Sequence, residues 1–145
     1  MSTRVAGLTG VTLQEAPGVC HDCVWWQSRS GRGVDKRRWI ERAETDWGAW
    51  GAVYRDDDGT VIGSMQYGPA ELFPHAWELP AGPPSDDALL VTCAYLLDRA
   101  SPWVLQSLFL AAIGDARDKK AGALETFAYR YHEGGSARER IVVHR

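Results

Sequence analysis

The sequence has 145 residues, of which 45% are hydrophobic, and this suffices for one domain with a single core. The net charge of −3 gives no positive field that would attract nucleic acid or an anionic membrane surface. No segment approaches 18 consecutive apolar residues and no secretory pattern follows Met1, so we expect a cytoplasmic protein without a membrane span.

The first third of the chain predicts one strand and two helices. Residues 11–15 alternate like an edge strand, and residues 20–27 favour a short helix. A Ser/Gly/Arg loop follows, and Asp35 can then cap a second helix with Trp39, Ile40, Ala43 and Trp47 on one face. The basic run at residues 36–38 is interpreted as the solvated start of this helix, because no aromatic stripe accompanies it.

The middle of the chain predicts a hairpin and a long loop. Residues 50–54 and 61–67 are apolar runs separated by a turn with Asp58-Gly59, which indicates antiparallel neighbours. Five prolines fall between residues 69 and 85, so this stretch is expected to be irregular. Its aromatic content favours a functional loop.

Residues 88–129 predict a strand, a helix and a second strand. The segment 88–97 is continuously apolar, and Val104, Leu108 and Ala112 recur at helical spacing after Ser101 and Pro102. Residues 123–129 alternate like a half-buried strand. Such a unit has parallel strands and presents a helix N-terminus at the carboxyl end of the first strand, where a phosphate-bearing ligand would bind.

The three cysteines do not predict a disulfide framework. Cys20 and Cys23 have C-x-x-C spacing, but no second pair completes a zinc shell, so we expect no metal. Packing in a local helix is the favoured interpretation, and zinc or redox use stays open. Cys93 is interpreted as a packing residue, with an acyl-cysteine role as the alternative.

Five stretches of the sequence resemble the GCN5-related N-acetyltransferase (GNAT) family. They are residues 20–26, 36–51, 62–70, 92–96 and 122–127, which together extend over nearly the whole chain. The resemblance implies an α+β fold: a mixed, mostly antiparallel twisted sheet with a parallel strand-helix-strand unit at residues 88–129. We expect one such domain over residues 1–145, short at its C-terminal end, where residues 141–143 make one short strand. Exchange across a homodimer would fill that gap.

The resemblance further implies transfer of an acetyl group from acetyl-CoA to a small-molecule or protein amine. In the family, a strand contacts the pantetheine arm and a glycine-rich loop at the next helix binds the pyrophosphate. Val104 and Gln106 stand at the glycine positions, where side chains can crowd the phosphates, and Arg99 or Ser107 would compensate. The implied cofactor-binding residues are Ala94, Tyr95, Leu96, Ser101, Trp103, Val104, Leu105, Gln106 and Ser107.

Candidate catalytic residues are Glu71 as base and Tyr67 or Tyr95 as acid. Ordinary structural roles are the alternative for each. A candidate acceptor pocket consists of Trp25, Trp26, Phe73 and Trp77, for which core packing is the alternative. The missing glycines and the short C-terminal part favour a second hypothesis for the whole chain, a noncatalytic interaction or ligand-sensing module that has lost the cofactor.

Overall fold

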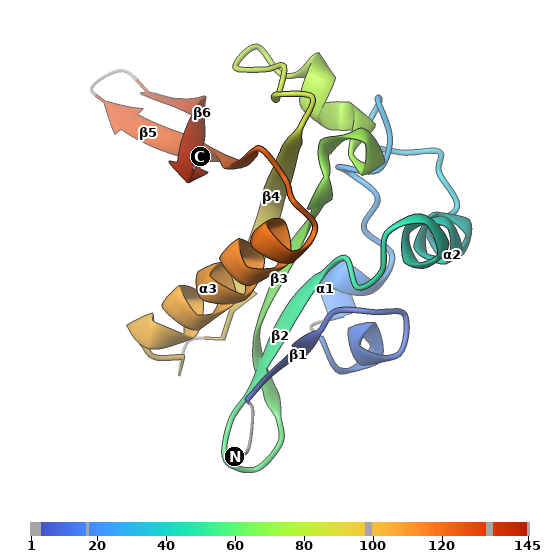
Figure 1. The fold of residues 1–145 in the computed structure, drawn as a ribbon, viewed down its shortest axis with the longest axis vertical. Coiled ribbons are helices and arrows are strands. Elements are labelled where there is room, and N and C mark those ends of the chain that lie inside the picture. The colour runs from blue at the N-terminus through green and yellow to red at the C-terminus, as the bar shows by residue number, and fades with distance from the viewer. Residues whose placement is uncertain (1–3, 17, 98–99, 133–134, 145) are drawn as a thin grey trace.

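Six strands form one mixed sheet in a computed structural model that describes residues 4–16, 18–97, 100–132 and 135–144 (Figure 1). The strands follow the chain order, and every neighbouring pair is antiparallel except β4 and β5. This arrangement confirms the predicted α+β class. The strands are β1 (Val5–Gly7), β2 (Gly51–Arg55), β3 (Val61–Pro69), β4 (Ala88–Leu96), β5 (Ala123–His132) and β6 (Gly135–His144).

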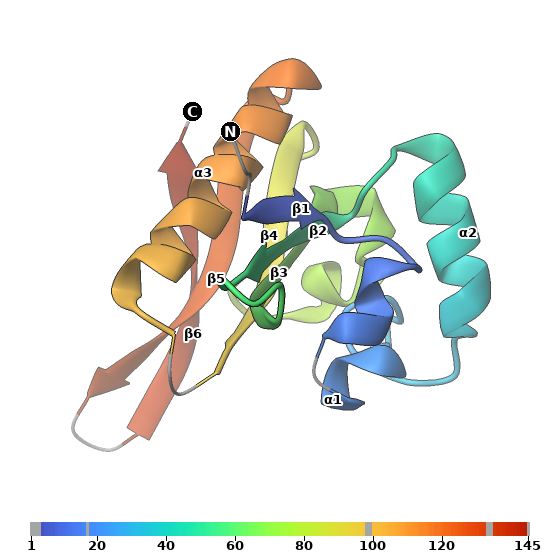
Figure 2. The same ribbon diagram turned by 90° about the horizontal axis from the view of Figure 1, so that it is seen from below.

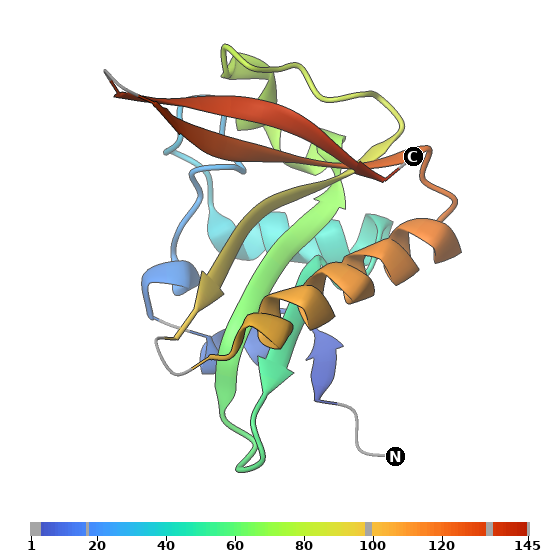
Figure 3. The same cartoon turned by 90° about the vertical axis from the view of Figure 1, so that its left-hand side faces the viewer.

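Helices cover both faces of the sheet. Helix α3 (Pro102–Asp118) packs on one face, and α1 (Gly18–His21) and α2 (Lys36–Asp46) lie on the other (Figures 2 and 3). Three 3₁₀ helices complete the structure: η1 (Thr12–Glu15), η2 (Ala70–Leu72) and η3 (Pro74–Glu78). Within the described ranges, no helix has the length and apolarity needed to cross a membrane.

The core is divided into two layers by the sheet. Under α3, the buried side chains include Met65, Tyr67 and Leu108. On the α2 side, they include Trp39, Trp50 and Phe73. The two layers follow from the alternation of side chains along each strand, which sends successive residues to opposite faces.

Glycine allows α3 to lie close to the sheet. A Cβ atom added to Gly63 of β3 would come within 2.8 Å of Val104 Cγ1. Val104 is buried in the first turn of α3, so this contact sets the height of the helix N-terminus above the sheet.

Several predicted elements are confirmed. Asp35 caps α2, where its carboxylate accepts hydrogen bonds from the backbone N–H groups of Arg37 and Arg38. The β2–β3 hairpin turns at Gly59, whose φ of 82° favours glycine. The parallel β4–α3–β5 unit is also present.

Two N-terminal predictions are wrong. Residues 11–15 do not form a strand: Val11 is the N-cap of η1 and the other four residues make up that helix. The chain turns at Thr9, whose backbone carbonyl accepts a hydrogen bond from Leu13 N at 2.9 Å. The helix expected over residues 20–27 ends at His21. Beyond it, the contiguous aromatic pair Trp25 and Trp26 packs at right angles, with ring centroids 4.8 Å apart, and no helical period continues.

Two further segments differ in extent from the predictions. The stretch at residues 69–85 includes η2 and η3, so it is only partly irregular. Residues 135–144 form a ten-residue strand paired along β5, where only a short strand at 141–143 was expected. The strand is longer than expected because β5 supplies backbone hydrogen-bond partners along its length in an antiparallel ladder. The local sequence pattern does not reveal such partners.

Candidate functional site

The candidate site lies where β4 and β5 separate. The two strands pair only from Ala88 with Ala123 to Val91 with Thr126, and β4 then continues to Leu96 without a described strand on that side. The Thr126 hydroxyl donates to the Val91 carbonyl at 2.9 Å, at the last paired position. Figure 3 shows β5 and β6 crossing away from β4. On its other side this segment pairs with β3, so the separation leaves to a ligand only those backbone N–H and C=O groups of residues 92–96 that point away from β3.

A β-bulge lies at the same point of β4. Cys93 pairs with Gln66 and Val91 pairs with Tyr67, so Thr92 is the extra residue. The Gln66 amide nitrogen donates to Thr92 Oγ1 at 2.8 Å, and its oxygen accepts from Gln27 Nε2 at 2.8 Å. All three polar side chains are buried. This network fixes the bulge and therefore the direction of β4 beyond it.

A cavity of about 210 Å³ opens beside this part of β4, on the α1 and α2 side of the sheet. Its wall is largely apolar. The lining residues are Leu8, Leu13, Ala16, Cys20, Cys23, Lys36, Trp50, Ser64, Gln66, Cys93, Ala94 and Tyr95. The cavity thus meets the segment of β4 that is not paired with β5 at Cys93, Ala94 and Tyr95.

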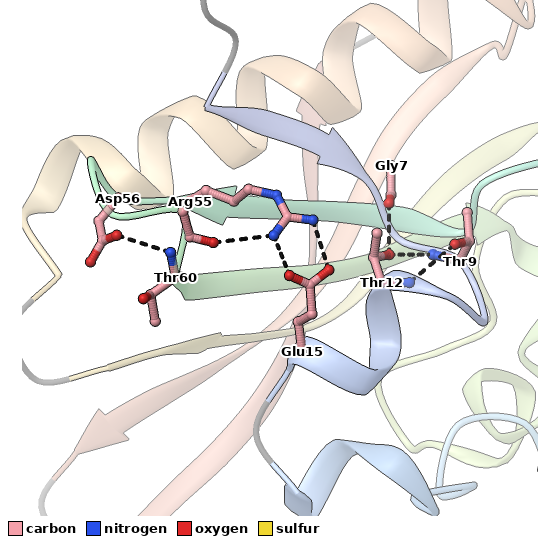
Figure 4. A network of polar contacts seen from close by, with 8 residues as sticks. Gly7, Thr9, Thr12, Glu15, Arg55, Asp56 and Thr60 are labelled. Atoms are coloured by element: carbon pink, nitrogen blue, oxygen red, sulfur yellow. Dashed lines mark hydrogen bonds and ion pairs between the residues drawn. The ribbon is translucent and has the colours of Figure 1, made fainter.

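An ion pair links η1, which contributes to the cavity wall, to β2. Leu13 belongs to η1, and Glu15 of the same helix forms a bidentate pair with Arg55. Figure 4 shows this pair beside the hairpin turn, where Asp56 Oδ1 accepts from Thr60 N at 3.0 Å. The Arg55 guanidinium lowers the pKa of Glu15, so the pair is charged at neutral pH.

Lys36 occupies a different environment from the solvated position predicted for it. Its ammonium donates to the Cys23 carbonyl at 2.6 Å and lies 5.5 Å from the centroid of the Trp50 ring. Desolvation by burial lowers the pKa of this lysine. Lys36 is therefore a half-buried cation in the wall of an apolar cavity.

Two of the three cavity thiols, those of Cys20 and Cys93, are poor nucleophiles at neutral pH. Cys93 is exposed to the cavity, and desolvation by the neighbouring protein atoms raises the pKa of its thiol to about 11. Burial also raises the pKa of Cys20. Within the described ranges, no group of three or more His, Cys, Asp or Glu side chains is arranged to hold a metal ion.

Helix α3 begins at Pro102, shortly after β4 ends at Leu96 in the sequence. Ser101 is its N-cap residue and makes no side-chain capping hydrogen bond, and Pro102 occupies the first turn. Val104, which stands where the family has glycine, points down onto Gly63 and is buried. The Val104 side chain is therefore directed toward β3, whereas the side chain of Gln106, at the second of the two positions, is exposed.

The other implied cofactor-binding residues lie on the same strand and helix. Ala94, Tyr95 and Leu96 end β4. In α3, Trp103 and Gln106 are exposed, whereas Leu105 and Ser107 are half-buried. Arg99 lies outside the described residues. The predicted strand and helix positions thus lie at the C-terminal end of β4, an interior strand, and in the first turns of α3.

The three catalytic candidates are placed apart. Tyr95 is 43% exposed and lines the cavity. Tyr67 is buried under α3, on the opposite face of the sheet, and its hydroxyl donates to Asp115 Oδ2 at 2.5 Å. Glu71 is exposed in η2 and is not part of the cavity wall. Of the three, the structure brings only Tyr95 to the cavity.

The four aromatic residues predicted as an acceptor pocket do not line the cavity. Trp26 and Phe73 are buried in the core, where Trp26 stacks on Phe127 with centroids 5.9 Å apart. Trp25 stacks on His75, whose Nδ1 is 2.7 Å from the Trp25 carbonyl oxygen. Trp77 packs against the same core. Their burial follows the usual role of large aromatic side chains.

Several residues of the site were not identified from the sequence. No sequence motif marks Gln27, Gln66 and Thr92, because these residues meet only in the folded chain. Gln27 and Gln66 are separated by 39 positions in the sequence, and Gln66 and Thr92 by 26. Lys36 was assigned to a solvated basic run. The one signal that could have marked Lys36 is its place directly after the cap of α2, where the helix faces the preceding segment.

Comparisons with known proteins show what this architecture is similar to. A ribosomal-protein-alanine N-acetyltransferase from Brucella melitensis aligns with a TM-score of 0.56 and 15% identity, covering 96% of this chain and 99% of that one. PaiA N-acetyltransferase from Thermoplasma acidophilum, solved with coenzyme A, aligns with a TM-score of 0.52 and 13% identity, covering 98% and 99%.

A third structure is longer than this chain. Naa20 from Chaetomium thermophilum, solved with a bisubstrate analogue, aligns with a TM-score of 0.52 and 13% identity. The alignment covers 90% of this chain and 65% of that one. The sequence matches no family model and no curated protein. Together, the sheet order, the separation of β4 from β5 and these structural similarities show that the chain has a GNAT-like fold.

Proposed function

We propose that this protein is an acyl-CoA-dependent N-acyltransferase that moves an acetyl group from acetyl-CoA to an amine. The observation that carries the proposal is the coincidence of three features near the C-terminal end of β4. Beta strand β4 leaves β5 after Val91, a cavity opens at Cys93 to Tyr95, and the N-terminus of α3 follows the same strand.

The geometry fits the parts of an acyl-CoA molecule. The pantetheine arm contains two amides, and the backbone groups of residues 92–96 that point away from β3 offer it hydrogen bonds of the kind found between strands. The dipole of this 17-residue helix favours the pyrophosphate at its N-terminus. In its first turn, Pro102 has no N–H and the Val104 N–H donates to the Ser101 carbonyl at 2.9 Å, so the dipole is the main attraction. The buried position of Val104 leaves that terminus accessible.

The reaction forms one bond and breaks another. The neutral amine nitrogen attacks the thioester carbonyl, the C–N bond forms, and the C–S bond breaks as the tetrahedral intermediate collapses. Backbone N–H groups of β4 near Ala94 would stabilise the oxyanion. The attacking nitrogen loses its proton to water, because no histidine or carboxylate is among the described lining residues. The leaving thiolate takes a proton from Tyr95, the proposed donor because its side chain lines the cavity, and solvent then reprotonates the tyrosinate.

One observation favours the noncatalytic alternative. Among the described residues, no histidine or carboxylate lines the cavity, so no ordinary general base stands beside the proposed position of the amine. In that alternative, the protein binds an apolar ligand in the cavity and transfers nothing.

The test is release of the coenzyme A thiol from acetyl-CoA in the presence of a panel of amines. We expect amine-dependent turnover that falls about 10²-fold or more in Tyr95→Phe. Tyr67→Phe is the matched control, because its hydroxyl lies under α3 and away from the cavity. Binding of acetyl-CoA with no turnover on any amine would favour the alternative, and equal turnover in Tyr95→Phe would remove Tyr95 from the mechanism.

A further inference from the structure

The cavity has an unusual charge distribution for a site that accepts an amine. Lys36 is the one residue among its described lining residues that carries a formal charge at neutral pH, and the rest of the wall is apolar or neutral. A second cation placed in this cavity would be repelled by the Lys36 ammonium at short range and low dielectric. Polyamines and lysine-rich protein segments are therefore poor occupants.

The Lys36 ammonium also has unused hydrogen-bonding capacity. An ammonium has three donors, and one of them is used by the Cys23 carbonyl at 2.6 Å. The rings of Trp39 and Trp50 lie 5.8 and 5.5 Å away and contact the cation through their faces. None of these groups carries a full negative charge.

The described lining residues include no carboxylate that could act as a counter-ion to Lys36. The thiols of Cys20 and Cys93 are held neutral because burial raises their pKa values. Asp22 attracts the ammonium from outside the lining residues. A half-buried cation is stabilised when an anion with matching hydrogen bonds binds beside it.

From this arrangement, and resting on the proposed function, we propose that the cavity binds a small apolar substrate with a carboxylate, and that Lys36 is the residue that selects the carboxylate. The size of the cavity agrees with such a substrate. An apolar cavity of about 150 Å³ holds a benzene ring, and this cavity has about 210 Å³. Leu8, Leu13 and Trp50 would contact the apolar part.

The carboxylate has two possible sources in an acyl transfer. It belongs either to the acceptor, as in an amino acid with an apolar side chain, or to the acyl group, as in succinyl-CoA. Both place the same charge beside Lys36 and leave the chemistry of the thioester unchanged. The experiment therefore contains one arm for each source and one arm that needs no catalysis.

The binding arm uses tryptophan fluorescence, because Trp39 and Trp50 lie beside Lys36. The wild-type protein is titrated with phenylacetate and with phenylacetamide, which has nearly the same shape and no charge. We expect phenylacetate to bind about 10- to 100-fold more tightly, as a charge-assisted hydrogen bond allows. Lys36→Met should abolish this difference, and Lys36→Arg should retain most of it.

Lys119→Met is the matched control. Lys119 also donates to a backbone carbonyl, that of Trp47 at 2.7 Å, and lies 4.8 Å from the centroid of the Trp47 ring. It follows the end of α3 and is not part of the cavity wall. We expect this variant to keep the wild-type preference for phenylacetate.

The two transfer arms identify the source of the carboxylate. In one, kcat/KM is compared for L-phenylalanine and L-phenylalaninamide as acceptors; in the other, for succinyl-CoA and acetyl-CoA as donors. We expect a preference for the anion in one arm, lost in Lys36→Met mainly through KM. Equal binding of phenylacetate and phenylacetamide by the wild-type protein would overturn the inference. Retention of the preference for phenylacetate in Lys36→Met would also overturn it. Absence of any transfer, with selective binding of phenylacetate, would refute the proposed function and leave the carboxylate site standing.

Discussion

The close contact between Gly63 and Val104 gives a sharp prediction, because one added methyl group should displace the N-terminus of α3. An added Cβ at Gly63 would lie 2.8 Å from Val104 Cγ1 and 3.0 Å from Leu96 Cδ2, whereas ordinary contacts begin at 3.4 Å. Leu96 can rotate, but Val104 is β-branched and fixed at χ1. We therefore expect Gly63→Ala to cost about 1–3 kcal/mol of unfolding free energy, as overpacking does.

Gly114 provides the matched control on the same helix. A Cβ at Gly114 meets no atom within 4 Å, apart from chain neighbours and the backbone of its own helix. Gly114→Ala should therefore raise the unfolding free energy by about 0.5–1 kcal/mol through helix propensity. The two Gly→Ala changes are chemically identical and should differ in sign.

Urea unfolding and acetyl-CoA titration measure the two consequences together. Gly63→Ala should lower both stability and affinity, because α3 would be lifted from β3 at the proposed pyrophosphate site, and Gly114→Ala should leave the affinity unchanged. Combining Gly63→Ala with Val104→Ala should relieve the clash, with a coupling energy of at least about 0.5 kcal/mol. Stability of Gly63→Ala equal to that of the wild type, or strict additivity of the double variant, would refute the packing argument.

Three other predictions concern buried groups. Glu125 is fully buried and accepts from Ser85 N at 2.9 Å and from Ser85 Oγ at 2.5 Å, so Glu125→Ala should cost about 2–4 kcal/mol in urea unfolding and Ser85→Ala clearly less. A loss below that of Ser85→Ala would contradict this. In a variant with Cys20 and Cys23 changed to Ser, the rate of alkylation of Cys93 by iodoacetamide should rise with pH until about 11, because only the thiolate reacts. A rate that levels off near the ordinary thiol pKa would show that Cys93 is not desolvated. Tyr67→Phe should lose about 1 kcal/mol of stability with the Asp115 hydrogen bond and keep its acetyl-CoA affinity, and a large loss of affinity would place Tyr67 in the site.

The elements that could be predicted from sequence are those with local causes. The cap at Asp35 and the turn at Gly59 act within a few residues, so their signals are contained in short windows. The helical spacing of Val104 and Leu108 reports burial on one face in the same local way.

One of the elements that were missed has a local cause, and the others depend on contacts distant in sequence. Residues 11–15 alternate as a strand would, but the hydroxyl groups of Thr9 and Thr12 favour a turn. The bulge at Thr92 depends on Gln66 from another strand, and the cavity forms only when the segment from Leu8 to Cys23 is brought against β4. Long-range pairing, rather than local preference, created the site.

The most direct test of the central claim is calorimetric titration of the folded protein with acetyl-CoA, with an adenine nucleotide as the comparison. We predict saturable binding of acetyl-CoA in the micromolar range and much weaker binding of the nucleotide, because the pantetheine arm would add contacts along residues 92–96 of β4. Absence of acetyl-CoA binding by a protein that unfolds cooperatively in urea would contradict the account. It would mean that the separation of β4 from β5 serves another ligand.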